Sequence, residues 1–198
     1  MSKPQPPLIK TERLLLTWPT PEQIDGYYDS IIGTSIFDTI FWDGPPHAQA
    51  LHDWWAQSVV RSPLDFSLSL DIAAIEQASG RYIGGVSLRP VDNDARILDI
   101  GYAFAVDSHG KGYATEAVGA LVDEAFSKRG AERIFGNAFV GNDGSRRVRA
   151  KLGFVHEGTQ RRCVCKRGVW LDQWMFAITR PDWESRQAGL ADGSSTKK

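Results

Sequence analysis

Two glycines separated by a single residue, Gly110 and Gly112, stand between an apolar run that ends at Val106 and a segment of helical spacing that begins near Tyr113. The pattern predicts a strand, a tight turn and the start of a helix. The first N–H groups of a helix have no partner inside it and carry partial positive charge, so such a junction suits a phosphate group. We interpret this stretch as a diphosphate site. The alternative is that the glycines only change the direction of the chain.

Two better-known phosphate loops do not fit this turn. A dinucleotide-binding fingerprint needs a third glycine where Thr115 stands, and a Walker loop needs Ser or Thr where Gly112 follows Lys111. A nucleoside-triphosphate enzyme is therefore disfavoured.

The size and charge of the chain indicate one soluble globular domain. Its 198 residues are enough to bury a sizeable core, and no apolar run approaches the roughly 18 residues of a membrane span. A net charge of −1 argues against nucleic acid binding as the main role. A proline cluster replaces the apolar core of a signal peptide near the start, so we expect a cytoplasmic protein that acts neither on membranes nor on nucleic acid.

The only cysteines, Cys163 and Cys165, lie on one face of a predicted strand. A zinc site needs about four ligands, and none of the four histidines has ligand spacing to this pair. We therefore expect no metal site and interpret both cysteines as small core residues.

The apolar patterns alternate between strand and helix along the chain. Prolines, glycines and capping residues divide the elements, among them Thr20, which can cap a helix that starts at Pro21. No regular pattern continues beyond Trp183. The expected helices cover residues 21–32, 47–62, 113–128 and 142–152, and the expected strands cover residues 14–16, 66–76, 82–88, 97–106, 133–140, 154–164 and 169–179.

The strand over residues 97–106 has two unlike faces. One face is bulky, whereas the other carries only small residues and a single carboxylate, namely Asp99, Gly101, Ala103 and Ala105. A bare face leaves room for a ligand beside the strand. The alternative is that a helix packs closely against it.

With these pieces in place, the chain resembles the GNAT superfamily of N-acetyltransferases, within the branch of the ribosomal-protein N-terminal acetyltransferases. The resemblance depends on the order of the stretches TERLLL, IGYAF, HGKGYATEA, NDGSRRVRAKLGF, HEG and GVWLDQWMFAI. It covers roughly residues 8–184, which we expect to form one domain with flexible ends at 1–7 and 185–198.

The resemblance implies an α/β fold of the GNAT type, in which helices cover both faces of a mixed, strongly bent sheet of about seven strands. Two central strands splay apart, and acetyl-CoA enters the gap between them. The family's pyrophosphate pattern R/Q-x-x-G-x-G/A maps onto His109, Gly110, Lys111, Gly112, Tyr113 and Ala114. His109 departs from the usual Arg or Gln, which puts one side-chain contact in doubt but not the backbone contacts.

The resemblance also implies contacts to the rest of the cofactor. The backbone of Phe104, Ala105 and Val106 is expected to pair with the pantetheine arm, and Asn142 to contact that arm, to cap its own helix, or both. Arg147, within a basic run over residues 146–151, is expected to approach the nucleotide phosphates, the alternative being a solvated helix face.

The reaction that the resemblance implies is direct attack of a primary amine on the thioester. The amine must lose a proton, the carbonyl oxygen must be polarised, and the departing thiolate benefits from a proton donor. The resemblance points to Ser145 as the acid and Asp99 as the base, with the shorter Asp side chain in place of the usual Glu. A backbone N–H near Ala105 or Val106 would polarise the oxygen, and Glu76 and Glu157 are reserve bases.

The acceptor is a primary amine on a protein N-terminus or on a small molecule. Trp42 and Glu76 are the expected acceptor-side residues, although the tryptophans are equally compatible with a core role. A homodimer is expected from the family. The alternative function is a non-catalytic acetyl-CoA-binding module of the same fold.

Overall fold

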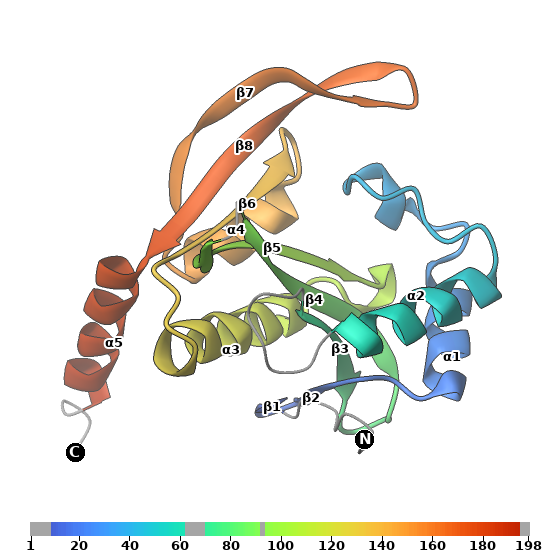
Figure 1. The fold of residues 1–198 in the computed structure, drawn as a ribbon, viewed down its shortest axis with the longest axis horizontal. Helices are drawn as coiled ribbons and strands as arrows, with labels where there is room; N and C mark the ends of the chain where they lie inside the picture. Colours follow the sequence, from blue (N-terminus) through green and yellow to red (C-terminus); the bar gives the residue numbers. More distant parts are fainter. Residues whose placement is uncertain (1–8, 62–69, 92–93, 195–198) are drawn as a thin grey trace.

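The computed structural model describes residues 9–61, 70–91 and 94–194. Within them an eight-stranded sheet runs in the order β1-β2-β3-β4-β5-β6-β8-β7 (Figure 1). The mixed α/β architecture is as predicted, with about one strand more than expected. The predicted end at 1–7 and the predicted strand residues 66–69 lie outside the described residues.

The elements are β1 (Ile9–Lys10), β2 (Leu14–Thr17), α1 (Pro21–Ile31), η1 (Ser35–Asp38), α2 (Ala48–Arg61), β3 (Leu70–Glu76), β4 (Tyr82–Val91), β5 (Asp94–Phe104), η2 (Val106–Ser108), α3 (Tyr113–Lys128), β6 (Arg133–Phe139), α4 (Asp143–Lys151), β7 (Val155–Lys166), β8 (Val169–Thr179) and α5 (Arg180–Ser194).

The start of α1 follows from its local sequence. The Thr20 side chain accepts a hydrogen bond from the Gln23 amide, and the Gln23 side chain accepts one from the Thr20 amide. This reciprocal capping satisfies two N–H groups that the helix itself cannot pair, and Pro21 occupies the first helical position, where no N–H is needed. The predicted capping box is confirmed.

The sheet opens between β5 and β6, the only parallel pair among the strands that the structure describes. These strands are paired at three positions, the last of which joins Asp99 to Phe135. Beyond that point β5 stays paired with β4 as far as Phe104, and β6 stays paired with β8 as far as Phe139. At the start of the opening, a side chain at Gly136 would come within 2.6 Å of the Ile100 carbonyl oxygen, so only glycine fits there. The expected splayed central pair is present.

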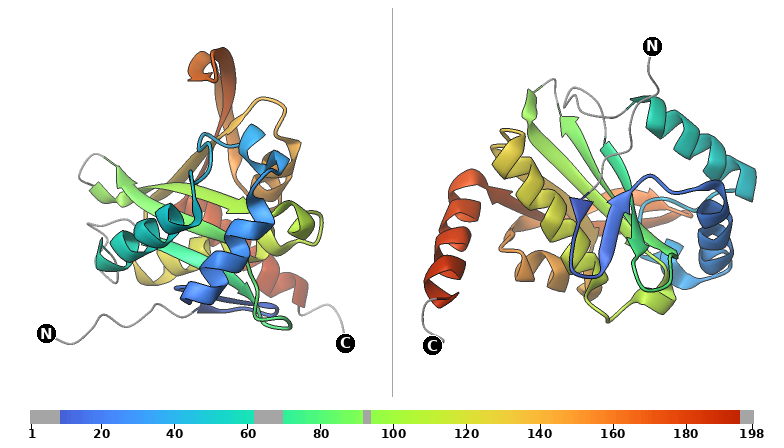
Figure 2. Two further views of the ribbon diagram at one scale, coloured as in Figure 1. Left: turned by 90° about the vertical axis from the view of Figure 1, so that its right-hand side faces the viewer. Right: turned by 90° about the horizontal axis from the view of Figure 1, so that it is seen from below.

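Two apolar cores lie on opposite faces of the sheet. The bulky face of β5, with Leu98 and Ile100, packs against Val118 and Leu121 of α3. The other core is formed mainly by α1 and α2 against β3 and β4, and the small residue Ala105 belongs to it. Figure 2 shows α3 on one side of the strands and α1 and α2 on the other. Each large side chain fully buried in these cores contributes about 1.5–3 kcal/mol.

The C-terminal part differs from the prediction. A helix, α5, continues to Ser194, although we expected no regular structure beyond Trp183. Trp183 stacks on Phe126 of α3 at 5.5 Å between ring centroids, and its indole N–H donates to Asp123 at 2.7 Å. Because these tertiary contacts with α3 hold the helix, its sequence needs little apolar periodicity of its own.

The strands β7 and β8 form a long hairpin that arches over the rest of the molecule (Figure 1). Cys163 and Cys165 are both exposed on β7. Our interpretation of these cysteines as core residues is wrong, because β7 is the edge strand of the described sheet and most of its side chains are exposed.

Candidate functional site

The glycine turn leads into the N-terminus of α3 as predicted. Gly110 and Gly112 have φ values of +75° and +84°, which residues other than glycine rarely adopt. Gly112 is the N-cap of α3, and among the described residues no side chain forms a capping hydrogen bond with this helix. Its first backbone hydrogen bond runs from the Glu116 amide to the Gly112 carbonyl. The amides of the first turn therefore remain available to an anion at the positive end of the helix dipole.

A contact that the sequence analysis missed supports this turn from outside. Arg13 on the segment before β2 forms an ion pair with Glu116 at 2.7 Å and also donates to the Lys111 carbonyl at 2.9 Å. Burial raises the pKa of Glu116, but hydrogen bonds from Thr11 and Arg13 outweigh that effect and hold it below its ordinary value. Glu116 therefore stays ionised and ties the first strands to the loop.

Contacts at the end of β5 bear on two predictions, the role of His109 and the choice between the Ala105 and Val106 amides. The His109 ring nitrogen Nε2 lies 2.8 Å from the Phe104 carbonyl oxygen, so this ring supports the loop internally. The Ala105 amide donates to the Ile83 carbonyl at 2.9 Å. Of the two amides expected to polarise the thioester oxygen, the one of Ala105 is thus occupied within the sheet, and the amide of Val106 is the remaining candidate.

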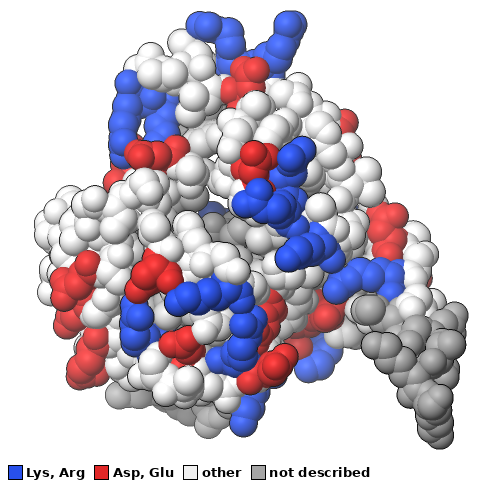
Figure 3. Space-filling view, turned by 180° about the vertical axis from the view of Figure 1, so that it is seen from behind, with Lys and Arg blue, Asp and Glu red and all other residues white. Residues whose placement is uncertain are grey.

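A cavity of about 1180 Å³ brings most of the predicted site together. Its lining passes from the glycine turn through the opening between β5 and β6 to the segment between α1 and α2. Figure 3 shows the molecule hollowed on this side, with Lys and Arg side chains gathered beside the hollow. The predicted residues that line the cavity are Trp42, Asp99, Phe104, His109, Gly110, Gly112, Tyr113, Ala114, Asn142, Ser145 and Arg147; those outside its lining are Glu76, Ala105, Val106 and Lys111.

Asp99 is the last residue of β5 that pairs with β6, so its carboxylate stands where the opening begins. Burial raises the pKa of Asp99, and the nearby guanidinium groups of Arg89 and Arg149 partly oppose this effect. A carboxylate with a raised pKa in a cavity is a better proton acceptor than an exposed one. The geometry is compatible with the predicted base.

Ser145 lies in the first turn of α4. Its amide donates to the Asn142 side chain at 3.0 Å, and its Oγ lies 2.8 Å from the Tyr102 hydroxyl oxygen. Asn142 also donates to the Thr39 carbonyl at 3.0 Å, so this side chain both caps α4 and holds the segment between α1 and α2. We had not singled out Tyr102 as a site residue. Its place beside a predicted site residue follows from the opening of the sheet, which no local pattern indicates.

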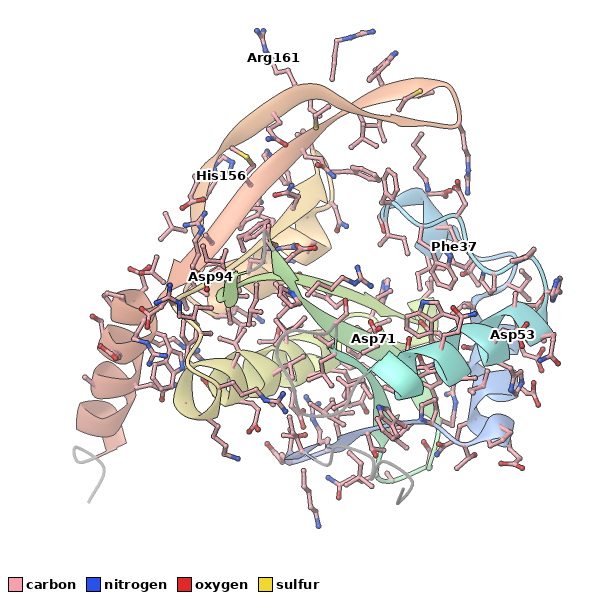
Figure 4. The ribbon with its side chains drawn as sticks, viewed as in Figure 1. Phe37, Asp53, Asp71, Asp94, His156 and Arg161 are labelled. Atoms are coloured by element: carbon pink, nitrogen blue, oxygen red, sulfur yellow. The ribbon has the colours of Figure 1, made fainter. Side chains whose placement is uncertain are left out.

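The acceptor side of the cavity is aromatic. Trp42, Trp54 and Trp55 line it. Trp42 and Trp54 are 42% and 40% exposed, whereas Trp55 is 3% exposed and also belongs to the core. Asp71 of β3, which the sequence analysis missed, is buried in this wall (Figure 4). It accepts a hydrogen bond from Ser58 at 3.2 Å and lies 3.5 Å from the Arg89 guanidinium.

Two carboxylates considered as reserve bases are engaged elsewhere. Glu76 accepts hydrogen bonds from Ser79 at 2.5 Å and from the Tyr113 hydroxyl, which lower its pKa. Glu157 forms an ion pair with Arg133 at 2.5 Å, and this lowers the pKa of Glu157. Neither residue lines the cavity, and Glu76 instead positions Tyr113 at the start of α3.

The tip of the β7–β8 hairpin contacts the segment between α1 and α2. Lys166 forms an ion pair with Asp43 at 2.7 Å and is itself 8% exposed. Arg167 forms ion pairs with Asp43 and Asp38, both at 3.1 Å. We call these four residues the hairpin latch. It fixes the segment that carries Trp42 and thus one wall of the acceptor side.

Two kinds of feature are absent from the part of the chain that the structure describes. It contains no group of three or more His, Cys, Asp or Glu residues placed to hold a metal ion. None of the helices in the same ranges is long and apolar enough to cross a membrane.

Comparison with known families gives a match over most of the chain. The model of the acetyltransferase (GNAT) domain family matches residues 13–155. The probable N-acetyltransferase YjcK of Bacillus subtilis (strain 168) is 42% identical over 105 residues, which make up 52% of this chain and 58% of that protein. The matched regions span between 50% and 59% of the first three curated relatives.

Solved structures share the fold at low sequence identity. A GNAT-family acetyltransferase from Bacillus anthracis has a TM-score of 0.77 at 20% identity, covering 88% of this chain and 99% of that one. RimL, a ribosomal L7/L12 alpha-N-protein acetyltransferase solved with coenzyme A, has a TM-score of 0.75 at 14% identity, covering 87% of this chain and 97% of that one.

Proposed function

Because the chain belongs to the acetyltransferase (GNAT) domain family, we propose that it transfers an acetyl group from acetyl-CoA to a primary amine. One observation carries the proposal. A single cavity joins the uncapped N-terminus of α3 to Asp99 and Ser145 through the opening between β5 and β6. An anion site can hold the cofactor, an opened strand edge can pair with its arm, and two proton-transfer groups can assist acetyl transfer from the thioester.

The cofactor fits the residues present. The positive φ values of Gly110 and Gly112 turn the loop, and a Cβ at Gly110 would have no described atom within 4 Å, which leaves room for a diphosphate beside the loop. The free edges of β5 and β6 beyond Asp99 leave backbone groups for an extended arm. Arg147 and Lys151 of α4 line the same cavity and add positive charge for phosphate groups. When bound, acetyl-CoA supplies the activated acetyl group.

Three residues of the chain then have separate roles in the reaction. Asp99 removes the proton that the amine must lose, directly or through water, and is competent only when ionised. Polarisation of the carbonyl oxygen falls to the Val106 amide, which follows the lining residue Phe104 by two positions, and donation of a proton to the sulfur falls to Ser145. Holding both reactants in one cavity is worth effective molarities of about 10⁵–10⁸ M, which exceeds the usual 10²–10⁴-fold from one acid or base.

The acceptor is a primary amine on a protein N-terminus or on a small molecule. RimL, which shares the fold, is an alpha-N-protein acetyltransferase, and this supports a protein N-terminus among the acceptors to be tested. The aromatic wall formed by Trp42 and Trp54 favours an apolar group beside the amine. The single domain over residues 8–184, the cytoplasmic location and the homodimer stay predictions.

The test is release of free thiol from acetyl-CoA over a panel of N-terminal peptides, lysine peptides, polyamines, aminoglycosides and amino acids. We expect turnover with one class and an acetylated amine detected by mass spectrometry. If calorimetry shows acetyl-CoA bound but no amine is acetylated, the protein is a binding module and the catalytic roles of Ser145 and Asp99 are wrong.

A further inference from the structure

Arg149 is a buried cation in the cavity wall. It lies one helical turn after Ser145 on α4, is 2% exposed and lines the cavity. A Cβ at Gly136 of β6 would lie 3.0 Å from its Nη2, so the absence of a side chain at Gly136 makes room for the guanidinium. The opened part of the sheet is therefore shaped around this arginine.

The guanidinium connects two hydroxyl groups. Its Nη1 donates to the Tyr102 hydroxyl at 3.1 Å and to the Ser145 hydroxyl, while its Nη2 donates to the Asn137 carbonyl at 3.0 Å. The Tyr102 and Ser145 oxygens are 2.8 Å apart. The Tyr102 hydroxyl also lies 3.2 Å from the Ser145 carbonyl, and either hydroxyl can be the donor in the 2.8 Å contact.

Counting donors shows what one of these two arrangements leaves free. A serine oxygen has two lone pairs, and when Tyr102 is the donor, one lone pair accepts from Arg149 and the other from Tyr102. The Ser145 hydroxyl proton is then free to point into the cavity, which all three residues line. In this arrangement Ser145 is set as a donor.

The charge of Arg149 has no carboxylate in ion-pair contact among the described residues. Asp99 acts on it only at longer range, and burial lowers the pKa of Arg149. An isolated buried cation is unfavourable unless a negative charge is present, so such a group is characteristic of a site where negative charge appears during function.

We propose that Arg149 and Tyr102 are positioning residues that act through Ser145 to stabilise and protonate the leaving thiolate. As the carbon–sulfur bond breaks, its electron pair goes to sulfur, sulfur takes the Ser145 proton, and Ser145 takes the Tyr102 proton. The charge ends on the Tyr102 oxygen beside Arg149, and the proton lost by the amine restores Tyr102 through solvent. This inference rests on the proposed function.

A phenol suits the end of this relay because its pKa near 10 lies within reach of a thiol near 8.5. Burial raises the pKa of Tyr102, and the Arg149 charge and the hydrogen bonds with Ser145 and Arg149 counteract part of that increase. Arg149 therefore keeps the phenol a usable proton source in a buried place.

The kinetic test uses Tyr102→Phe, Ser145→Ala and their double variant with the amine identified from the panel. Each single change should lower kcat about 100-fold and leave the KM for acetyl-CoA within about twofold, because binding does not use these hydroxyls. The double variant should be no slower than the slower single variant, since the groups act in series. Additive losses, or an unchanged kcat in Tyr102→Phe, would overturn the relay.

The matched control is Arg146→Gln on the same helix. Arg146 is exposed, pairs with Asp143 and does not line the cavity, so its loss should change kcat less than twofold. Arg149→Gln should lower kcat by about as much as Tyr102→Phe does. Arg149→Lys should recover part of kcat, because it keeps a cation at this position. An Arg149→Gln enzyme with normal kcat would contradict the proposal.

A second readout needs no amine and no turnover. Calorimetry first establishes that CoA binds, and ultraviolet absorbance of the thiolate then gives the pKa of the bound CoA thiol. We expect this pKa to lie at least one unit below about 8.5 in the wild type and to return towards it in Ser145→Ala and in Arg149→Gln. Bound CoA with an unshifted thiol overturns the relay alone, whereas absence of CoA binding overturns the proposed function as well.

Discussion

The two sides of the cavity are built in different ways. The cofactor side, defined here as the glycine turn with the first turns of α3 and α4, consists of short continuous stretches whose backbone groups face the cavity. The acceptor side, defined as the segment over residues 35–46 with the wall formed by α2 and β3, is held by side chains far apart in sequence, as in the hairpin latch. Backbone amides suit a constant ligand, and side chains can vary with the acceptor.

Asp99 lies where the two sides of the cavity meet, and its substitution is expected to have the largest effect on activity. We expect Asp99→Asn to lower kcat/KM for the amine about 100-fold and to leave the affinity for acetyl-CoA within twofold. Because burial raises the pKa of Asp99, wild-type activity should fall as the pH falls through that raised pKa, and the variant should lack this limb. Steady-state kinetics between pH 5 and about 9 check this, and an unchanged limb in the variant would show that another group is the base.

The same substitution has a stability consequence of definite sign. A carboxyl group whose folded pKa is raised favours folding most when it is neutral, so it opposes folding once the pH exceeds that pKa. Asp99→Asn should therefore raise the free energy of unfolding near pH 7, and the gain should shrink as the pH falls. Urea unfolding at two pH values measures it, and a less stable variant at pH 7 would contradict the assigned environment.

A glycine pair at opposite ends of α3 tests the cofactor side. Gly112 and Gly130 both have positive φ, so Ala at either position should cost about 1 kcal/mol of stability. Only Gly112→Ala should also weaken acetyl-CoA binding, by about tenfold, because only that end faces the cavity. Calorimetry on both variants measures the difference, and equal affinities would mean that the turn does not hold the diphosphate.

The hairpin latch tests the acceptor side. We expect Lys166→Met to raise the KM for the amine about fivefold without changing acetyl-CoA affinity, because the segment that carries Trp42 loses its anchor. The Lys166 and Arg167 contacts lower the pKa of Asp43, so the latch should persist down to that lowered pKa and weaken only in stronger acid. A change confined to acetyl-CoA affinity would reverse the assignment of the two sides.

The smallest effect is expected on the outer part of the hairpin, which belongs to neither side. Cys163 and Cys165 are exposed and absent from the cavity lining. Replacing both with Ser should change kcat and both KM values by less than about twofold. The melting temperature should change by less than about 1 °C. A large loss of activity would assign β7 a role that its contacts do not show.

Local patterns were enough to predict the glycine turn, the capped start of α1 and the unlike faces of β5, because each depends on neighbours in the chain. They did not predict features that depend on packing between distant parts of the sequence. From the sequence, Arg149 is part of a basic run that is expected to be solvated. Its burial depends on Gly136, thirteen residues earlier, which leaves space for the guanidinium. Trp183 holds α5 through contacts about 60 residues away. Lys166 and Asp43 are 123 residues apart, and no local spacing joins them.

The most direct test of this division is a crystal structure of the wild-type protein with acetyl-CoA. We expect the diphosphate on the amides of residues 110–114, the pantetheine arm in the opening beyond Asp99, and the sulfur within hydrogen-bond reach of Ser145 Oγ, with the wall at Trp42 left free for the amine. A cofactor that instead occupies the aromatic side, or that avoids the α3 N-terminus, would contradict both the proposed function and the division of the cavity.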